Sequence, residues 1–373
     1  MAAALVLLCR SAVGYPVGLQ APSLGRSRRL HSTLLFADAI FPESFRSPRD
    51  QQTRAQKRKS SQTLRRSAEL ERPEIIYSSN HVCVVNKPPG WKSQPGNGAG
   101  GGEQRMEDEK CLLSYLKSQS EGGGSKKDFI VPTHRLDQPC TGVLVFAKNG
   151  KAASRIQVAW SKQQVRKEYW VVVETGDDLN LLKKRSEPLH DKRTFRLSAI
   201  LKVNKSAQKG GRRGNKNAGG SVVVKPLSSG HGSQEPDGRV CHIEWQQLIR
   251  LQSTPSGSRH LLSVKTDTGA KHQVRALLAL HGGAPISGDL RYGNQNNSQF
   301  QRRHQTGVGR VDNPLPDGSV ALHARSVFLP TVKLGGMEFL AKDSFIAPIP
   351  RRWSEFFNLR EGDVKGNKKM KNF

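Results

Sequence analysis

Residues 134–148, HRLDQPCTGVLVFAK, are the most informative stretch of this sequence. The first half is a polar loop with His134, Arg135 and Asp137, and the second half is the β-branched, apolar run expected of a buried strand. Catalytic side chains are often carried by a loop that a rigid strand holds in place. The same residues also fit an ordinary turn, in which Asp137 caps backbone N–H groups and Pro139 fixes the bend. The stretch by itself leaves both interpretations open.

Similar runs elsewhere in the chain predict a fold of the α+β class. The expected strands are residues 81–86, 142–147, 168–174, 194–203, 240–251 and 261–266, and the expected helices are residues 151–164 and 271–281. Few of the strand pairs have a helix between them, so their pairing should be mainly antiparallel. We therefore predict a mixed, mostly antiparallel sheet with flanking helices.

The charge of the chain indicates a polyanionic partner. Its 373 residues include 60 Lys and Arg against 31 Asp and Glu, a formal net charge of +29, and the basic excess is spread along the chain. Such a field attracts nucleic acid, and a basic protein surrounded only by counterions is the alternative. The longest apolar run, Ala2–Cys9, is too short to cross a membrane, so no membrane partner is expected. The five cysteines follow no paired spacing, which argues against a disulfide framework and a zinc site.

Composition divides the chain into four parts. Residues 1–32 contain arginines and serines but no acidic residue, as expected of an organelle transit peptide. We expect import into the mitochondrial matrix, with a plastid as the alternative; a secretory signal ranks lower because the arginines follow the apolar run. Residues 33–72 are expected to be a disordered basic linker, residues 73–360 the folded catalytic domain, and residues 361–373 a basic tail.

Three segments within the folded domain have the composition of flexible insertions. They lie near residues 96–110, 202–238 and 293–318 and are rich in glycine and polar side chains, so they are not expected to bury enough apolar surface to order themselves. The basic part of the second insertion, residues 202–216, is expected to contact the phosphates of a nucleic acid.

Five further segments, read in order along the chain, produce a family resemblance. They are VVNKPPGW (residues 84–91), RKEYWVVV (166–173), TGAKHQVR (268–275), PISGDLRYG (285–293) and LHAR (322–325). Together with the HRLD loop and the strand that follows it, they resemble the RluA-type RNA pseudouridine synthases over roughly residues 74–330. Each segment alone is a modest match, but their joint order is specific. The chain is expected to be an organellar member of that family.

The resemblance implies a reaction and a set of site residues. Members of the family convert uridine in RNA to pseudouridine with no cofactor and no metal, on a mixed sheet with a central RNA-binding cleft. Asp137 matches the catalytic aspartate, which can serve as a nucleophile at the sugar or the base, or as a base on the sugar. Arg275 matches the basic residue that pairs with this aspartate, and Tyr169 matches the tyrosine that stacks on the target base. Arg135 is the candidate to fill the space left by the flipped nucleotide.

The sequence also departs from the family pattern. Ala270 replaces the arginine of the usual Thr-Gly-Arg-x-His motif, and Leu277 replaces a histidine, which puts contacts with the RNA backbone in doubt. Cys140 and Thr141 stand where Thr-Ser is usual, which is a milder change. Lys87 of the Lys-Pro-Pro-Gly turn is expected to contact a phosphate or to pack its stem, and it is not assigned to the catalytic set.

Two other functions fit parts of the sequence. A non-catalytic RNA-binding or ribosome-assembly factor on the same fold would explain the altered motif and the insertions, with organellar ribosome assembly intermediates as its partners. A hydrolase would use Cys140 with His134, but a cysteine directly after a proline is a poor candidate for an activated thiol, and no oxyanion motif accompanies it. The favoured interpretation is a monomeric RNA pseudouridine synthase that acts on rRNA, tRNA or mRNA.

Overall fold

The computed structural model describes residues 71–95, 110–120, 129–204, 221–227, 238–254, 257–293, 309, 311, 313–330 and 344–365. All of them belong to one compact unit of the chain, Ser60–Phe373. The predicted transit peptide, residues 33–70 of the predicted linker and residues 205–216 of the predicted phosphate-binding segment lie outside the described residues.

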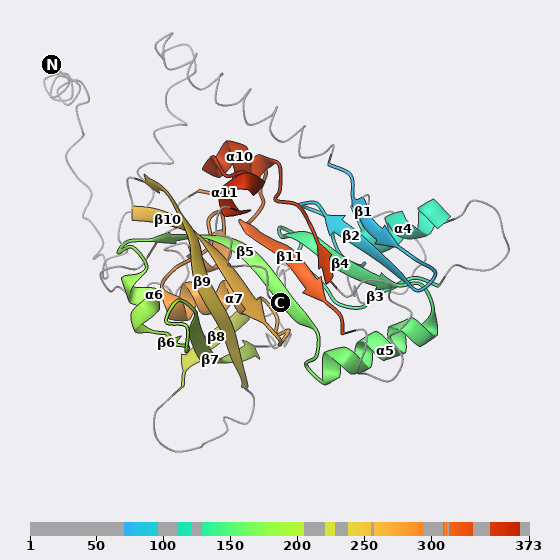
Figure 1. Cartoon of the computed structure of the whole chain (residues 1–373), viewed down its shortest axis with the longest axis horizontal. Coiled ribbons are helices and arrows are strands. Elements are labelled where there is room, and N and C mark those ends of the chain that lie inside the picture. The colour runs from blue at the N-terminus through green and yellow to red at the C-terminus, as the bar shows by residue number, and fades with distance from the viewer. Residues whose placement is uncertain are drawn as a thin grey trace, which may run out of the picture. The chain divides into compact units, whose positions relative to one another are not determined.

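A single mixed sheet forms the centre of this unit (Figure 1). Along its main path the strands are β1 (Glu74–Ser78), β2 (Val82–Lys87), β4 (Thr141–Ala147), β11 (Leu322–Phe328), β5 (Arg166–Thr175), β10 (Gly257–Thr266), β9 (Arg239–Thr254), β7 (Phe195–Asn204) and β6 (Glu187–Pro188). Off this path, β3 (Val131–Pro132) pairs with β4, β8 (Ser221–Pro226) with β7, and β12 (Ser344–Ile346) with β11. Strands β4 and β11 run parallel, and the other strand pairs of the described ranges are antiparallel. The predicted mixed, mostly antiparallel sheet is confirmed.

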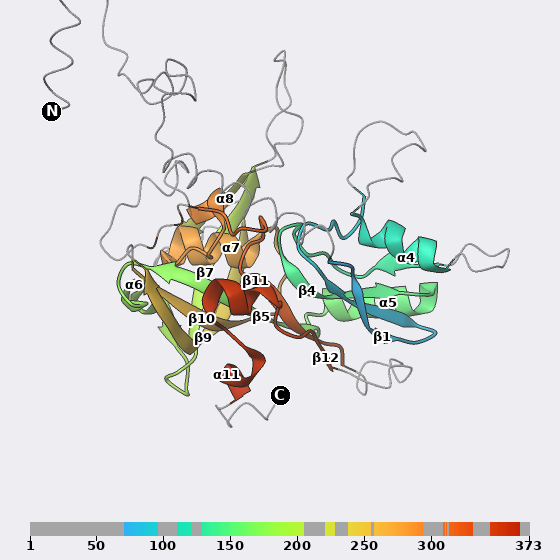
Figure 2. The same cartoon turned by 90° about the horizontal axis from the view of Figure 1, so that it is seen from above.

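Helices cover both faces of the sheet. Those of the described residues are α4 (Leu112–Ser120), α5 (Gly150–Ser161), α6 (Asn180–Lys184), α7 (Gln273–Ala276), the π-helix η3 (Leu277–Gly282), α8 (Leu290–Gly293), α10 (Arg352–Phe357) and α11 (Glu361–Lys365). Figure 2 shows α7 and α8 on one side of the sheet and α11 on the other. Both predicted helices are present, the first as α5, which begins after the capping residue Asn149, and the second as α7 and η3. All six predicted strands are present as β2, β4, β5, β7, β9 and β10.

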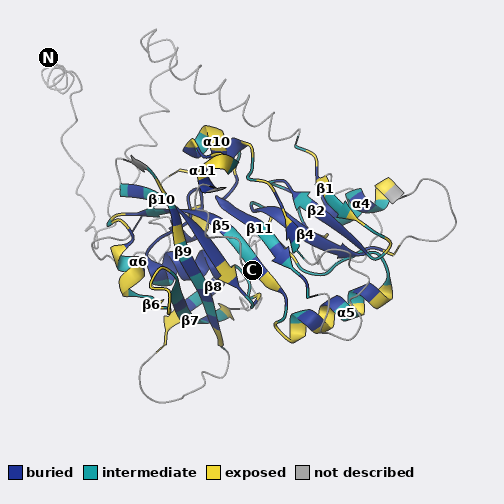
Figure 3. Cartoon of the chain, in the orientation of Figure 1, coloured by how far each residue is buried: buried dark blue, intermediate teal, exposed yellow. Residues whose placement is uncertain are grey.

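Strand β4 shows how the core fixes the loop that precedes it. All seven residues of β4 are buried, and the strand is dark blue in Figure 3. Its valines, Val143 and Val145, pack in the same cluster as α5, on one face. Its larger side chains, Leu144 and Phe146, pack in the cluster that contains α4 on the other face. A slip by one residue would force leucine and phenylalanine into spaces shaped for valine, so the register of β4 is well defined.

The prediction of a flexible insertion at residues 202–238 is wrong over part of its length. Residues 221–226 form β8, which pairs antiparallel with β7. Val222 and Val224 are 2% and 4% exposed and belong to a core cluster. The physical reason is that a short run can bury two valines once a neighbouring strand satisfies its backbone N–H and C=O groups, and composition alone does not reveal that neighbour.

Two other predicted segments also contain buried residues. Val311 and Leu315 lie within the predicted insertion 293–318, and both are buried. Val364 of α11 lies within the predicted basic tail, and it is buried as well. Single apolar side chains in otherwise polar segments are enough to attach those segments to a core, so the folded part of the chain extends past residue 360.

Gly142, the second residue of β4, has a backbone conformation that glycine adopts easily and other residues do not. Its φ is +111°, and a Cβ atom built there would collide with the backbone of Ala324 on the parallel strand β11. The close approach of β4 and β11 therefore requires glycine at this position.

We expect Gly142→Ala to lower the free energy of unfolding by about 2–4 kcal/mol, because it adds both backbone strain and a steric clash. Urea unfolding followed by circular dichroism measures this change. Gly150→Ala is the matched control, since a Cβ atom at the start of α5 would meet nothing within 4 Å. The control should be neutral or more stable by up to about 1 kcal/mol. Equal stability of the two variants would contradict the tight packing of β4 against β11.

Candidate active site

A cavity of about 280 Å³ lies where distant segments of the chain meet. Its lining comes from the Asp137 loop (residues 134–140), from the start of β5, from β11, from the end of β10 with the β10–α7 turn (residues 267–272), and from α7. All four predicted site residues line the cavity: Arg135, Asp137, Tyr169 and Arg275. The fold thus brings these residues together around one space.

Arg275 binds two carboxylates at once. Its Nη1 atom donates to Asp137 Oδ2 at 2.9 Å, while its Nε and Nη2 atoms donate to the two carboxylate oxygens of Asp289 at 2.7 and 2.9 Å. Arg275 and Asp289 are 6% and 1% exposed. Burial opposes the charge of Arg275, but the hydrogen bonds and charge of Asp289, with a weaker contribution from Asp137, raise its pKa above the usual value. Arg275 is therefore a permanent cation whose plane Asp289 fixes, and its Nη1 atom remains for Asp137.

His272 is a second neighbour of Asp137. It adopts a left-handed backbone conformation, with φ at +53°. Its Nε2 atom lies 3.6 Å from Asp137 Oδ1, and its Nδ1 atom lies 2.7 Å from the hydroxyl of Tyr292. Burial lowers the pKa of His272 to about 4 against the opposing charge of Asp137, so the ring is neutral near pH 7. A neutral ring that accepts from Tyr292 at Nδ1 carries its proton on Nε2, facing Asp137.

Sequence reasoning assigned no role to Asp289 or His272. Both residues lie inside segments that carry the family resemblance, Asp289 in PISGDLRYG and His272 in TGAKHQVR. A titratable side chain inside such a segment is a candidate site residue, and this was the one sequence feature that could have indicated them. The sequence does not contain the distances. Asp289 is 14 positions from Arg275, and only the packing of η3 and α8 brings the two side chains within hydrogen-bond reach.

Tyr169 and Arg135 contribute an aromatic ring and an exposed cation to the cavity. Tyr169 packs at the junction of two core clusters, and burial raises the pKa of its hydroxyl group, which is therefore neutral. Arg135 is exposed to solvent. A paired carboxylate, a neutral aromatic wall and an exposed guanidinium are suited to a flat, uncharged ring attached to an anionic backbone.

Lys87 holds the Asp137 loop from within the core. Its Nζ atom donates to the backbone carbonyls of Pro88 at 3.0 Å, Gln138 at 3.0 Å and Cys140 at 2.6 Å. The side chain is fully buried, so of the two alternatives predicted for Lys87 the phosphate contact is wrong and the packed stem is the one present. Burial lowers the pKa of Lys87 to about 7. Two of its three acceptors follow Asp137 in the chain, so Lys87 fixes the backbone that carries the carboxylate.

His134 also serves the loop and does not activate a nucleophile. Its Nε2 atom accepts from the backbone N–H of Val145 at 3.1 Å, and burial lowers its pKa to about 3. Burial, followed by the charge of Asp137, raises the pKa of Cys140 to about 12. A protonated thiol and a histidine whose Nε2 atom is already bonded do not make a nucleophile–base pair. The geometry therefore disfavours the hydrolase alternative.

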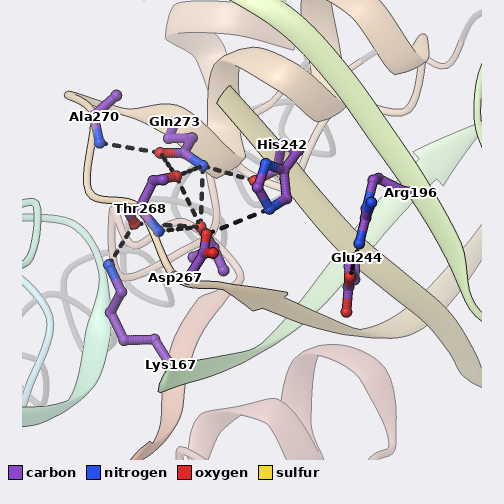
Figure 4. Close-up of polar contacts among 9 residues, drawn as sticks. Lys167, Arg196, His242, Glu244, Asp267, Thr268, Ala270 and Gln273 are labelled. Carbon is purple, nitrogen blue, oxygen red and sulfur yellow. Dashed lines mark hydrogen bonds and ion pairs between the residues drawn. The ribbon is translucent and has the colours of Figure 1, made fainter. Parts of the chain in front are cut away.

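Gln273 organises the β10–α7 turn (Figure 4). Its Oε1 atom accepts from the backbone N–H of Ala270 at 3.0 Å, and its Nε2 atom donates to the carbonyl of His242 at 2.9 Å. From β5, Lys167 donates to the carbonyl of Thr268 at 2.7 Å. The turn is thereby held by a side chain of α7, a backbone group of β9 and a side chain of β5 before any ligand arrives.

The two departures from the family pattern fall in different surroundings. Ala270 lines the cavity, so the change from arginine alters the cavity wall. Leu277 is fully buried in a core cluster and does not line the cavity. The hydrogen bond between Arg275 and Asp137 is present with leucine at position 277.

Within the ranges that the structure describes, no three His, Cys, Asp or Glu side chains gather as a group that could hold a metal ion. No helix in that part of the chain is long and apolar enough to span a membrane. The cysteines there are free and buried: Cys83, Cys111, Cys140 and Cys241.

The half-buried ring of His134 gives the protein an acid-sensitive contribution to stability. Its pKa is about 3 in the folded chain against 6.5 ordinarily, so the unfolded chain binds one more proton between these pH values and stability falls as the pH falls. His134→Gln keeps an acceptor for Val145 but does not titrate. The slope of unfolding free energy against pH should therefore become shallower by about 1.4 kcal/mol per pH unit between about pH 6 and pH 4.

Urea unfolding at several pH values measures this slope. The exposed His190→Gln variant is the control and should keep the wild-type slope, because that ring meets solvent in both states. An unchanged slope in His134→Gln would show that His134 is not held neutral in the folded protein.

Known proteins resemble this chain over the region that forms the site. The family model for RNA pseudouridylate synthase matches residues 81–280. The mitochondrial pseudouridylate synthase RPUSD4 of Rattus norvegicus is 27% identical over 276 residues, which are 71% of this chain and 63% of the rat protein. The uncharacterized RNA pseudouridine synthase slr1629 of Synechocystis is 26% identical over 282 residues, 76% of this chain and 67% of that protein. The solved structure of human RNA pseudouridylate synthase domain containing 4 is 18% identical, has a TM-score of 0.47 and is matched over 78% of this chain and 93% of its own.

The chain spans a little under two thirds of the length of the rat relative. The family model matches more than half of the chain, and the matched range includes Asp137, Tyr169 and Arg275. This chain belongs to the RNA pseudouridylate synthase family.

Proposed function

We propose that this chain isomerises uridine to pseudouridine in RNA, with Asp137 as the catalytic carboxylate and Arg135, Tyr169 and Arg275 as substrate-binding residues. The observation that carries the proposal is the 2.9 Å contact between Arg275 Nη1 and Asp137 Oδ2 in a cavity that Tyr169 also lines. A carboxylate paired with a guanidinium keeps its charge when a base covers it, because the opposite charge offsets the loss of solvent. Membership of the family supports the same activity.

The reaction exchanges one bond to the sugar for another without a net change in atoms. The N1–C1′ bond breaks, the uracil turns, and C5 bonds to C1′; C5 loses its proton and N1 gains one. The Asp137 carboxylate can attack the sugar, attack the base or remove a proton from the sugar, and each of these roles needs the anion. The neutral ring of His272, 3.6 Å from Asp137 Oδ1, is a polar neighbour that adds no charge beside the carboxylate.

Tyr169 is proposed to contact the detached uracil, and Arg135 is proposed to fill the space that the target nucleotide leaves in the RNA stack. Stacking on the neutral Tyr169 ring holds the detached uracil while it turns, a contact worth on the order of 1–3 kcal/mol. The target nucleotide must leave its stack to reach Asp137, and the planar guanidinium of Arg135 can take its place there. A cavity of about 280 Å³ suits a single everted nucleotide.

We also propose that the substrate is organellar RNA in the mitochondrial matrix. Residues 1–32 have the composition of a transit peptide, and the rat and human relatives are named as mitochondrial proteins. Other relatives are named for tRNA, in Vibrio vulnificus, and for the ribosomal large subunit, in Buchnera aphidicola. Mitochondrial tRNA and rRNA, followed by mRNA, are therefore the substrates to test.

A non-catalytic RNA-binding factor is the second candidate, because Ala270 lines the cavity where the family pattern has an arginine. Binding alone gives no reason to bury Arg275 with Asp289 and aim its third donor at Asp137. That arrangement favours catalysis over the non-catalytic alternative.

Asp137→Asn tests the catalytic assignment. An amide of the same size cannot act as a nucleophile or base, so product formation should fall by about 10³-fold or more while the Kd for RNA changes less than about 3-fold. Mass spectrometry of pseudouridine formed on mitochondrial RNA from cells lacking this protein measures the product, and filter binding measures Kd. Asp363→Asn, exposed on α11, is the control and should behave as wild type. Wild-type turnover by Asp137→Asn would refute the assignment.

Asp289→Asn tests whether the guanidinium must be held in one plane. The amide offers only one acceptor oxygen, so Arg275 loses a charged hydrogen bond, and kcat should fall by about 10–100-fold with a smaller change in KM. Glu174→Gln is the matched control, because Glu174 pairs with Arg259 at 3.1 Å and does not line the cavity. A change in KM larger than the change in kcat would contradict a positioning role for Asp289.

A further inference from the structure

A group of cations lies in or beside the lining of the cavity, and the proposed catalytic roles do not use all of them. Lys271 and Arg135 both line the cavity; Arg135 is exposed and Lys271 is half-buried. Arg291, the second residue of α8, is exposed. Its guanidinium is 5.7 Å from the ring centre of Tyr292, and the hydroxyl of Tyr292 is 2.7 Å from Nδ1 of His272. Lys271 and Arg135 therefore line the cavity from two segments, and Arg291 stands on a third segment beside Tyr292, which contacts His272 of the cavity lining.

These charges act on one another. Burial lowers the pKa of Lys271, the charges of Arg291 and Arg135 lower it further, and the charge of Asp137 opposes them. Asp137 already accepts a hydrogen bond from Arg275 at 2.9 Å, so its negative charge is largely balanced by Arg275 and not by Lys271. Like charges held close together are unfavourable by themselves, and the arrangement becomes favourable when an anion binds among them.

The turn that carries Lys271 is positioned before a ligand arrives (Figure 4). Gln273 accepts from the backbone N–H of Ala270, directly before Lys271, and Lys167 donates to the carbonyl of Thr268. A cation on a backbone that is already fixed loses less freedom when it binds than a cation on a freely moving loop. The turn is therefore suited to hold one group of the ligand in a defined place.

We propose that Lys271 and Arg291 form a phosphodiester subsite that holds the RNA backbone of the target nucleotide while its base occupies the cavity. The proposal rests on the proposed function, RNA pseudouridine synthase. An everted nucleotide carries a phosphate on each side of its sugar, so a base inside the cavity brings a phosphodiester to the entrance. Ala270 lines the cavity without a charge, and the adjacent lysine supplies the positive charge of this turn.

Lys271→Met removes the charge and keeps the length of the side chain. In the full chain, we expect KM and Kd for a target RNA to rise about 10-fold, with a smaller change in kcat. The slope of log Kd against log salt concentration should become shallower by about 0.7, as for one lost phosphate contact on a single strand. Lys265→Met is the matched control. Lys265 is an exposed lysine of β10 that pairs in register with Glu168 and Glu244 and does not line this cavity, so its replacement should change none of these values.

A modified RNA tests the phosphodiester directly. Uncharged methylphosphonate linkages on both sides of the target uridine should weaken binding to the wild type about 10-fold and should weaken binding to Lys271→Met less, because this variant has already lost one of the two contacts with the linkage. Adding Ala270→Arg to Lys271→Met should restore binding, since position 270 lines the same cavity. Equal weakening of the wild type and Lys271→Met by the modified RNA would overturn the proposal, as would a wild-type KM and salt slope in Lys271→Met.

The binding measurements separate this proposal from the proposed function, because they need no product. If Asp137→Asn kept full turnover, or if the wild type formed no pseudouridine, the proposed function would fall. A weaker, less salt-dependent affinity in Lys271→Met would still support the subsite. If Lys271→Met unfolds at the same temperature as the wild type, its lower affinity for RNA comes from the lost contact and not from a change in the fold.

Discussion

The guanidinium of Arg275 is the interaction on which the candidate site depends. Its three nitrogen atoms donate to two carboxylates, and the pair it makes with Asp289 is almost completely buried. Charges removed from water are costly to a fold unless their partners are present with good geometry, so neither Arg275 nor Asp289 is stable there without the other. The same contact connects α7, the segment before α8 and the Asp137 loop at one point, and it therefore ties the electrostatics of the site to the packing of the fold.

The sheet supplies the accuracy that this contact needs. Strand β4 is buried on both faces and lies against β11 so closely that Gly142 has no room for a side chain. Lys87, at the end of β2, binds backbone carbonyls that follow Asp137. A hydrogen bond of about 2.9 Å tolerates little displacement of its partners, so the loop must be held by the core and not by its own residues.

Charge acts on two scales in this protein. The net charge of +29 reaches beyond the surface and draws a polyanion towards it, but this attraction is screened by salt over about 8–10 Å. Inside the site, each charge is set against a particular partner, and burial leaves the rings of His134 and His272 neutral near pH 7. Composition can report the first scale because it is a sum over the chain. The pairing of charges inside the site depends on which side chains lie in contact in the folded chain, and composition does not report this.

Patterns along the chain predicted six strands, two helices and the candidate site residues, because periodicity and turn chemistry depend on neighbours in the sequence. The six strands and two helices expected from such patterns are all present, and Arg135, Asp137, Tyr169 and Arg275 came from motifs of a few residues. Strand β8 was not predictable, because its order comes from pairing with β7. The packing of the fold places Asp289 against Arg275, His272 near Asp137 and Lys87 behind the Asp137 loop. These contacts join side chains from separate elements, and no local pattern contains the distances between them.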